Sequence, residues 1–500
     1  MGRYVVALDQ GTTSSRAVLI DRTGEVAGVA QSVFPQHFPR PGWVEHDPKE
    51  ILASQLKVLT EVLVERGITV ADLDSVGITN QRETTIVWDR ATGEPVYNAI
   101  VWQCRRTAEL VERICCTAEI RQRVTELTGL IPDAYYSASK LAWILENVPG
   151  VRERAEAGEL LFGTVDTWLI WNLTRGAVHA TDPTNASRTM LFDIRTGKWS
   201  SYLCELFGIP ESLLPEVRPS SGDFGVIDHP VIKGGIPIRG VAGDQQSALF
   251  GQCCFAPGGA KATFGTGCFL LMHTGAEPCS SEHGLVTTVA ASAPGTDHLE
   301  YALEGSVFMA GALMQWLRDG LGLIEDVADS ERVAQSVEDS AGVYVVPAFT
   351  GLGAPYWDAD ARGAIFGLTR GAQRAHLVRA CLEAQGYQVN DVLVAMQKDA
   401  GVKLTSLAVD GGACRNDFLC SFCADAIDAS IVRPGNVETT ALGAAYLAGL
   451  ASGFWSSTDE IRSMRRVDHL FEPTLPKSRR EELLAGWADA VRRTRTSESI

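Results

Sequence analysis

Apolar, β-branched runs alternate along this chain with segments whose apolar residues keep helical spacing. The pattern predicts strands over residues 4–8, 17–20 and 75–79, each short and rich in Val, Ile or Leu. A helix is predicted between the second and third of these strands. Strands that alternate with amphipathic helices indicate an α/β protein.

The predicted helix carries clear signals at both ends. It begins after Asp47, with Pro48 at its first position and Glu50 in its first turn, and Gly67 ends it. Its expected apolar positions are Leu52, Leu56, Leu59 and Leu63.

A turn with a late glycine recurs three times, at residues 21–25, 89–94 and 193–197. Each turn follows an apolar run, and its glycine stands where positive φ is needed, so each predicts an antiparallel hairpin. A purely parallel sheet does not contain such hairpins. We therefore expect a mixed sheet that contains an antiparallel meander.

The second half repeats the scheme of the first. A strand over 261–264 turns through Gly265-Thr266-Gly267 into a strand over 268–272, and a later strand over 407–409 ends in Asp410-Gly411-Gly412. The Gly/Pro-rich stretch before residue 243 suggests a boundary near 248–256. We predict two domains, 1–250 and 251–500, that bind one nucleotide in the cleft between them.

The segment Asp9-Gln10-Gly11-Thr12-Thr13-Ser14-Ser15-Arg16 joins the first two strands. Its glycine lets backbone N–H groups approach an anion, and four hydroxyl side chains add donors. Asp9 is placed to hold a hydrated Mg²⁺ beside that anion. The segment therefore predicts a nucleoside triphosphate site, and the alternative is an ordinary hairpin with a polar turn.

Composition narrows the function classes. The chain has 500 residues, a net charge of −17 and a pI near 5.1, which argues against nucleic acid or an anionic membrane as the main partner. No apolar signal segment or bilayer-length apolar run is found, so we expect a cytoplasmic protein without an integral membrane segment. Its 12 cysteines lack the spacing of a zinc site and are expected to be free thiols.

Several motifs in linear order resemble one family, the FGGY carbohydrate kinases of the actin/hexokinase/Hsp70 ATPase-fold superfamily. The segments that carry the resemblance are residues 7–16, 78–85, 102–106, 135–147, 163–168, 182–189, 242–246 and 363–368. The resemblance implies two ribonuclease H-like (actin-like ATPase) domains, with mixed sheets flanked by helices and an inter-domain cleft. It also implies ATP and Mg²⁺ as cofactors, and a homodimer or homotetramer.

Within the family, Asn80-Gln81-Arg82-Glu83 resembles the members that phosphorylate glycerol, whereas members that act on ketopentoses have a different segment here. The resemblance makes Asp244 the general base for the acceptor hydroxyl, although a helix N-cap would also explain this residue. The acceptor hydroxyls would be held by Arg82, Glu83, Tyr135, Asp244 and Gln245, and its CH groups by Trp102 and Phe269. Residue type alone favours a surface loop for Arg82-Glu83 and plain core for the two aromatics.

The same resemblance assigns the nucleotide site. Thr12, Thr13 and Ser14 would form the first phosphate turn, with Arg16 reaching the transferred phosphate and Asp9 binding Mg²⁺ through water. The remaining nucleotide contacts would be Thr266 in the second phosphate turn and, around the adenosine, Gly311, Gln315, Gly412 and Asn416. For Gly311, tight helix packing is an alternative explanation.

Three hypotheses follow. The first is a phosphotransferase that uses ATP and glycerol, the second is another FGGY polyol or sugar kinase such as a pentulokinase, and the third is a non-catalytic nucleotide switch. A switch should lack the acceptor residues, and a sugar kinase should lack Arg82-Glu83. The residues present favour the first hypothesis.

Overall fold

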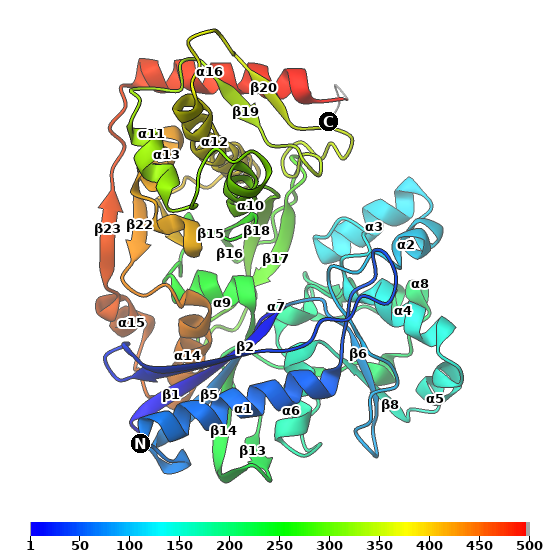
Figure 1. The fold of residues 1–500 in the computed structure, drawn as a ribbon. Coiled ribbons are helices and arrows are strands. Elements are labelled where there is room, and N and C mark those ends of the chain that lie inside the picture. Colours follow the sequence, from blue (N-terminus) through cyan, green and yellow to red (C-terminus); the bar gives the residue numbers. More distant parts are fainter. Residues whose placement is uncertain (1, 497–500) are drawn as a thin grey trace.

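The computed structural model describes residues 2–496 and contains two mixed sheets flanked by helices (Figure 1). The first sheet has the order β13-β14-β5-β1-β2-β3. Its strands are β1 (Tyr4–Gln10), β2 (Ser14–Asp21), β3 (Val26–Val33), β5 (Leu73–Asn80), β13 (Val226–His229) and β14 (Ile232–Gly243). Strands β1, β2 and β3 form an antiparallel meander, and β5 and β14 run parallel to β1. The predicted mixed sheet is confirmed.

The three predicted turns have the expected backbone but not always the expected pairing. Gly24, Gly93 and Gly197 have φ of 80°, 74° and 69°. The first turn joins β2 to β3, and the third joins β10 (Phe192–Asp193) to β11 (Lys198–Trp199). The hairpin predicted at the second turn is reduced to one bridge, because β6 (Ile86–Asp89) pairs instead with β8 (Leu160–Gly163).

Helix α1 (Pro48–Arg66) is the predicted one. Asp47 accepts a hydrogen bond from the Lys49 N–H at 2.8 Å, and Gly67 ends the helix in the left-handed conformation. Its core face differs slightly from the predicted stripe, since Leu52 and Leu56 are only partly buried. Its buried apolar residues after the first turn are Val58, Leu59, Val62 and Leu63, which lie with Ile51 on the side of the helix that covers β2 and β3.

The two faces of β1 pack against different parts of the chain. Val6 and Leu8 belong to the core beneath α1 and α6 (Val165–Leu173), whereas Val5 and Ala7 pack with α14 (Thr439–Ser452). Side chains along a strand alternate between faces. Asp9 therefore lies on the same face as α14, away from the α1 core.

Helix α14 is far from β1 in the sequence and still covers the first sheet, beside α9 (Asp244–Gly251). The contact is backbone against backbone. A Cβ on Gly77 would lie 2.1 Å from the Ala444 oxygen, and one on Gly240 would lie 2.5 Å from the Ala448 nitrogen. These two glycines allow the late helix to seat on the early sheet.

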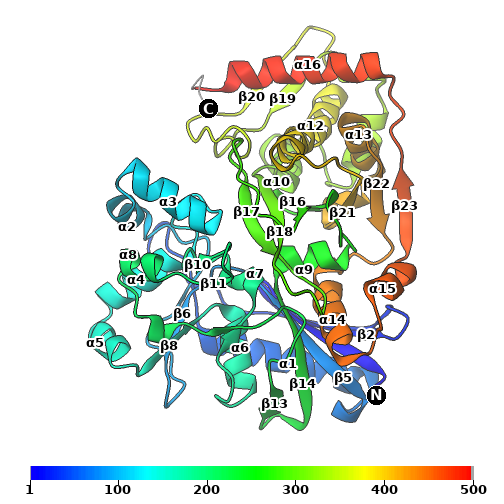
Figure 2. The same cartoon turned by 180° about the vertical axis from the view of Figure 1, so that it is seen from behind.

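The second sheet repeats the first, as predicted. Its order is β17-β18-β16-β15-β21-β22-β23, with β15 (Gly259–Phe264), β16 (Cys268–Gly275), β17 (Val286–Ala290), β18 (Glu300–Val307), β21 (Ser406–Asp410), β22 (Ile431–Pro434) and β23 (Val467–Phe471). Strand β15 is antiparallel to β16 and parallel to β21. One face is covered by α12 (Arg374–Ala400) and its neighbours, and the other meets α9, as both views show (Figure 2).

Between β3 and β13 lie β4 (Glu45–His46), β7 (Ala99–Ile100), α2 (Ala108–Ile114), α3 (Ala118–Thr128), α4 (Ser137–Asn147), α5 (Val151–Glu156), β9 (Ala180–Thr181), α7 (Pro183–Ala186), α8 (Ser201–Phe207) and β12 (Glu216–Val217). Later in the chain are α10 (Gly311–Gln315), α11 (Asp329–Gln335), β19 (Tyr344–Val346), β20 (Ala364–Phe366), α13 (Asp417–Ile427), α15 (Thr458–Met464) and α16 (Lys477–Thr494). Within residues 2–496, no helix combines the length and apolar character needed to cross a bilayer.

Candidate functional site

The predicted site residues gather where parallel strands end. Gln10 of β1 lies opposite Asn80 of β5, which lies opposite Gly243 of β14. The turns that follow these three strands therefore emerge at one edge of the first sheet. In the second sheet, Thr263 lies opposite Asp410, so the two glycine turns of that half also emerge together. Ligands in α/β proteins bind beyond the carboxyl ends of such strands.

The first phosphate turn is tighter than predicted. The strands extend through Gln10 and from Ser14, which leaves Gly11, Thr12 and Thr13 as the turn. Ser15 is wrongly placed among the outward hydroxyls, because it is fully buried and its Oγ lies 2.8 Å from the Gln10 amide oxygen. Thr12, Thr13 and Ser14 are not buried, so three hydroxyls remain for a phosphate.

Arg16 lies on the same strand face as Ser14 and meets the second half of the chain. Its Nη1 lies 2.9 Å from Oε2 of Glu438, the residue just before α14. Both side chains keep about a third of their exposure, so solvent screens the pair and it is worth at most ~1 kcal/mol. A phosphate could replace Glu438 as the partner of Arg16 at little cost.

Asp9, the predicted magnesium residue, has a carboxyl pKa well above its ordinary value. Burial, opposed by Arg16 and helped by the nearby carboxylates of Asp244 and Glu438, raises its pKa to about 7. No group of three or more His, Cys, Asp or Glu side chains in residues 2–496 could hold a metal alone. Mg²⁺ that keeps several waters and shares a nucleotide fits such a site, since it needs only one or two carboxylates.

We expect Asp9→Asn to raise the Mg²⁺ concentration needed for half-maximal activity by about 10- to 100-fold, the usual loss when a residue behind a metal-bound water is replaced. The substitution removes the charge and keeps the shape. Titration of activity with Mg²⁺ at saturating nucleotide measures the effect. A requirement equal to that of wild type would exclude Asp9 as the magnesium residue.

Arg82 and Glu83 are deeply buried, with 3% and 1% of their side chains exposed. The alternative of a surface loop is therefore wrong. Glu83 also has a φ of 61°, a left-handed conformation that is unusual for a residue with a side chain. Strained backbone of this kind persists only where the surroundings hold it, and it is concentrated at functional sites.

Asp244 is the first residue of α9 and is preceded by Gly243 as the cap, so the N-cap alternative is wrong. Its Oδ1 lies 3.2 Å from the Arg82 Nε, and 32% of its side chain is exposed. Burial raises the pKa of Asp244 above its ordinary value, while Arg82 and Lys261 act to lower it. A carboxylate with a raised pKa beside a cation can accept a proton and remain in place.

The other predicted acceptor residues surround this pair. The rings of Trp102 and Tyr135 meet edge to face with centroids 5.6 Å apart, and the Trp102 Nε1 donates to the Thr12 hydroxyl at 3.0 Å. Trp102 thus connects the acceptor residues to the phosphate turn. It is only half-buried, as is Phe269, so neither is plain core. Gln245 accepts a short hydrogen bond from the Lys261 Nζ.

Four charged or amide residues that our sequence reasoning missed complete this cluster: Arg188, Gln246, Lys261 and Glu304. All four are buried, and all contact Arg82, Glu83 or Gln245. A signal was present for all four, since Arg188 and Gln246 lie in the motif segments 182–189 and 242–246. Lys261 and Glu304 interrupt apolar strands at positions where the side chain faces the first half of the chain.

The second phosphate turn packs on the start of α10. The Ala310 and Ala312 N–H groups each donate to the Thr266 oxygen at 3.0 Å. A Cβ on Gly311 would lie 2.5 Å from the Gly265 oxygen, so close packing does explain this glycine. The side chains of Thr266 and Gln315 remain exposed.

Two of the predicted adenosine residues differ in how closely other parts of the chain contact them. A Cβ on Gly412 would meet open space, which leaves room for a base against the backbone. Asn416 is already engaged, because its Oδ1 caps α13 at the Leu419 N–H, 2.9 Å away, and its Nδ2 lies 3.3 Å from the Ser330 hydroxyl. The Nδ2 carries two N–H groups, so the second can donate to adenine while the first keeps the Ser330 contact.

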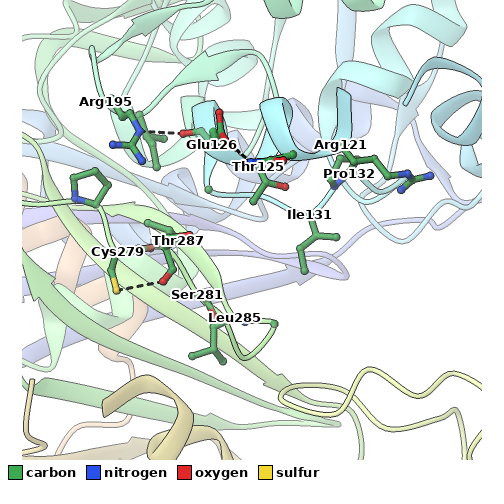
Figure 3. A pocket seen from close by; sticks show the side chains of 16 residues that line it. Arg121, Thr125, Glu126, Ile131, Pro132, Arg195, Cys279, Ser281, Leu285 and Thr287 are labelled. Carbon is green, nitrogen blue, oxygen red and sulfur yellow. Dashed lines mark hydrogen bonds between the residues drawn. The ribbon is translucent and has the colours of Figure 1, made fainter. Parts of the chain in front are cut away.

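A separate pocket of about 380 Å³ lies between α3 and the loop before β17 (Figure 3). Thr125 and Ile131 lie on one side of it, and Cys279 and Leu285 on the other. Its lining contains none of the predicted site residues. The candidate site is thus the strand-end cluster and not this pocket.

Comparison with known proteins agrees with this arrangement. Residues 4–251 match the N-terminal domain of the FGGY family of carbohydrate kinases, and residues 260–452 match its C-terminal domain. The chain is 57% identical to glycerol kinase from Carboxydothermus hydrogenoformans, over 99% of both chains. It is 59% identical to glycerol kinase from Fusobacterium nucleatum subsp. nucleatum, over 99% of this chain and all of the other.

Solved structures show the same fold. Plasmodium falciparum glycerol kinase with ADP superposes with a TM-score of 0.94 at 38% identity, covering 98% of each chain. A ligand-bound xylulose kinase from Lactobacillus acidophilus shares the fold at 22% identity, with a TM-score of 0.87 and 98% of each chain covered. The predicted actin-like ATPase fold is confirmed by these matches. The chain belongs to the FGGY family of carbohydrate kinases.

Proposed function

We propose that this protein transfers the γ-phosphoryl group of ATP to glycerol, giving sn-glycerol 3-phosphate and ADP, as an enzyme of glycerol catabolism. The observation that carries the proposal is the buried Arg82–Glu83 pair with Asp244 beside it, 3.2 Å from the Arg82 Nε. Relatives with 57–59% identity over the whole chain are named glycerol kinases, which supports the same activity.

Glycerol would sit between the charged pair and the aromatic residues. Arg82 donates to its hydroxyls and Glu83 accepts from them, while Tyr135 and Gln245 hold the remaining hydroxyl contacts. Trp102 and Phe269 cover the CH groups. A polyol needs such alternating donors and acceptors, because a buried hydroxyl without a partner costs ~1–3 kcal/mol.

In the reaction, the terminal hydroxyl oxygen of glycerol attacks the γ-phosphorus, and the bond from that phosphorus to the β,γ-bridging oxygen breaks. The hydroxyl proton passes to Asp244, which acts as general base. ADP leaves with the bridging oxygen. The charge that develops on the transferred group would be met by Arg16 and by the hydroxyls of both phosphate turns.

The nucleotide would bridge the two halves. Thr12, Thr13 and Ser14 contact its phosphates from the first sheet, and Thr266 contacts them from the second. Gly311, Gln315, Gly412 and Asn416 surround the adenosine, and Asn416 donates to the base with its second Nδ2 N–H. Bound Mg²⁺ would neutralise phosphate charge, and Asp9 would hold it through water.

A coupled assay of ADP release tests the proposal against a sugar kinase or a nucleotide switch. The acceptors to compare are glycerol, dihydroxyacetone, glyceraldehyde, xylulose and ribulose. We expect glycerol to have the highest kcat/KM. A preference for either ketopentose would establish a pentulokinase, and nucleotide binding without transfer to any acceptor would indicate a switch.

We also infer assembly and location from the family. A homodimer or homotetramer in the cytoplasm is expected, which light scattering after size-exclusion chromatography and cell fractionation would check. The high negative charge is unsuited to nucleic acid, so small molecules are the expected partners.

We expect the two halves to close when glycerol and nucleotide are both bound. Phosphate turns on separate sheets can hold one triphosphate only if the sheets approach each other, and closure also keeps water from the phosphate. Small-angle scattering with glycerol and a non-hydrolysable ATP analogue measures the change. An equal radius of gyration in the free, singly bound and ternary states would contradict a large closure. Substantial ATP hydrolysis without glycerol would contradict the exclusion of water.

A further inference from the structure

Glu304 lies on β18 of the second sheet and reaches into the first half of the chain. It shares a sheet face with Ala302, which packs against α9 together with Leu271. Only 4% of its side chain is exposed. Burial alone would raise the pKa of Glu304, but Arg188 and Arg82 outweigh burial and hold the pKa at about 2. Glu304 is therefore a buried, charged group between the two halves of the chain.

Glu304 fixes the plane of the Arg82 guanidinium. Its Oε2 accepts from the Arg82 Nη1 at 2.6 Å, and its Oε1 accepts from Nη2 at 3.1 Å. This bidentate geometry orients an arginine more strictly than a single bond does. Nη1 also donates to Gln246 at 3.1 Å, and Nε faces Asp244. Among the described residues, one N–H of Nη2 has no partner and is available to an acceptor hydroxyl.

Glu304 also acts on Glu83 through a second arginine. Arg188, fully buried after α7, donates from Nη2 to the Glu304 Oε1 at 3.1 Å and from Nε to the Glu83 Oε1 at 2.6 Å. The backbone of Glu83 is in the left-handed region, a strained conformation that persists only where surrounding contacts hold it. Glu304 thus contacts Arg82 directly and is linked to Glu83 through Arg188.

We propose that Glu304 is a positioning residue, which sets acceptor affinity by holding Arg82 directly and Glu83 through Arg188 in the geometry that binds glycerol. This inference rests on the proposed function. Since Glu304 belongs to the second sheet, the acceptor site is complete only when that sheet meets the first. Acceptor binding and the approach of the two halves are then coupled through one carboxylate.

The alternative is a structural ion pair that stabilises the contact between the two halves of the chain without affecting glycerol binding. The two roles differ in what they change. A structural role predicts a lower melting temperature with an unchanged KM, whereas a positioning role predicts a higher KM for glycerol and no change in the KM for ATP.

Glu304→Gln is the principal test, because it removes the charge and keeps the size. We expect the KM for glycerol, and the glycerol dissociation constant from calorimetry, to rise about 10- to 100-fold, a loss typical of misplaced binding groups. The KM for ATP should stay within about twofold of wild type. Glu383→Gln is the matched control, because Glu383 is another buried carboxylate paired with an arginine, Arg379, at 2.8 Å. It should leave the KM for glycerol unchanged.

A double-mutant cycle tests whether Glu304 acts through Arg82. In the Arg82→Ala background, Glu304→Gln should raise the KM for glycerol by a smaller factor than it does in wild type, because one of the two groups that it positions is absent. Additive effects would overturn the inference.

Two further variants cover a Glu304→Gln chain that does not fold. Glu304→Asp keeps the charge but shortens the reach to the arginines, and Arg188→Lys keeps the charge but loses the fork that joins Glu83 to Glu304. Both should raise the KM for glycerol. If wild type phosphorylates glycerol and the folded variants keep its KM, the inference fails and the proposed function stands. If wild type does not phosphorylate glycerol, both fail.

Discussion

Asp244→Asn is expected to bind ATP and glycerol and to lose phosphoryl transfer by ~10²–10⁴-fold, the usual contribution of a general base. The amide keeps the size of the side chain and cannot take the acceptor proton. Arg82 would keep a polar neighbour at the same place, so acceptor binding should change little. Rapid-quench measurement of the transfer step, with calorimetry for both ligands, separates chemistry from binding.

Asp329→Asn supplies the matched control. Asp329 is also the first residue of a helix, and 35% of its side chain is exposed, against 32% for Asp244. The same loss of charge at the same helix position should leave the transfer rate within about twofold of wild type, because surface changes away from the site have small effects. A near-normal kcat for purified Asp244→Asn would refute its assignment as the base.

Local signals predicted much of the fold. Asp47, Pro48 and Gly67 predicted the limits of α1, because caps act on neighbouring backbone groups only. The turn glycines at 24 and 197 predicted their hairpins for the same reason. The turn at Gly93 has the predicted backbone, yet its strand pairs with β8, because a partner about 70 residues away offers a longer ladder.

Long-range pairing is what the sequence pattern does not contain. The Arg82–Glu304 contact joins residues 222 positions apart, and α14 crosses back to cover the first sheet. Periodicity shows which face of a strand is apolar, but not which distant element covers the opposite face. The burial of Ser15, in contrast, could have been predicted from the alternation of side chains along the strand. As a neighbour of Ala17 on the strand, Ser15 must share the face that packs against α1.

In the candidate site too, local motifs could be predicted from the sequence, and long-range contacts could not. The motif order identified Arg82, Glu83 and Asp244. Residue type alone favoured a surface loop for the first two and left a helix cap and a general base equally open for Asp244. Burial of the pair and the position of Asp244 inside α9 exclude the surface loop and the cap. Of the ions that balance the cluster, Arg188 lies in the motif segment 182–189 but was assigned no role there, and Glu304 lies in a strand without a motif. Charge balance in a buried site is a three-dimensional property.

Arg82→Ala is expected to raise the KM for glycerol by roughly 10- to 150-fold while the KM for ATP changes little, since a buried hydrogen bond to a charged group is worth ~1.5–3 kcal/mol. The substitution also leaves Glu304 and Asp244 without their shared cation. Breaking a buried ion pair on one side costs ~3–5 kcal/mol of stability. Melting temperatures must therefore accompany the kinetics, which should be measured well below the transition.

Two comparisons make the Arg82 result specific to the acceptor. Arg106→Ala removes an equally buried guanidinium, paired with Glu45 at 2.7 Å, and should lower stability with no effect on the KM for glycerol beyond about twofold. Arg82→Lys keeps the charge near Glu304 and loses the fork, so it should recover stability more fully than acceptor affinity. Equal rises in the KM values for glycerol and ATP in Arg82→Ala would instead make Arg82 a structural or phosphate-binding residue, and the acceptor site would then have to be sought elsewhere along the strand ends.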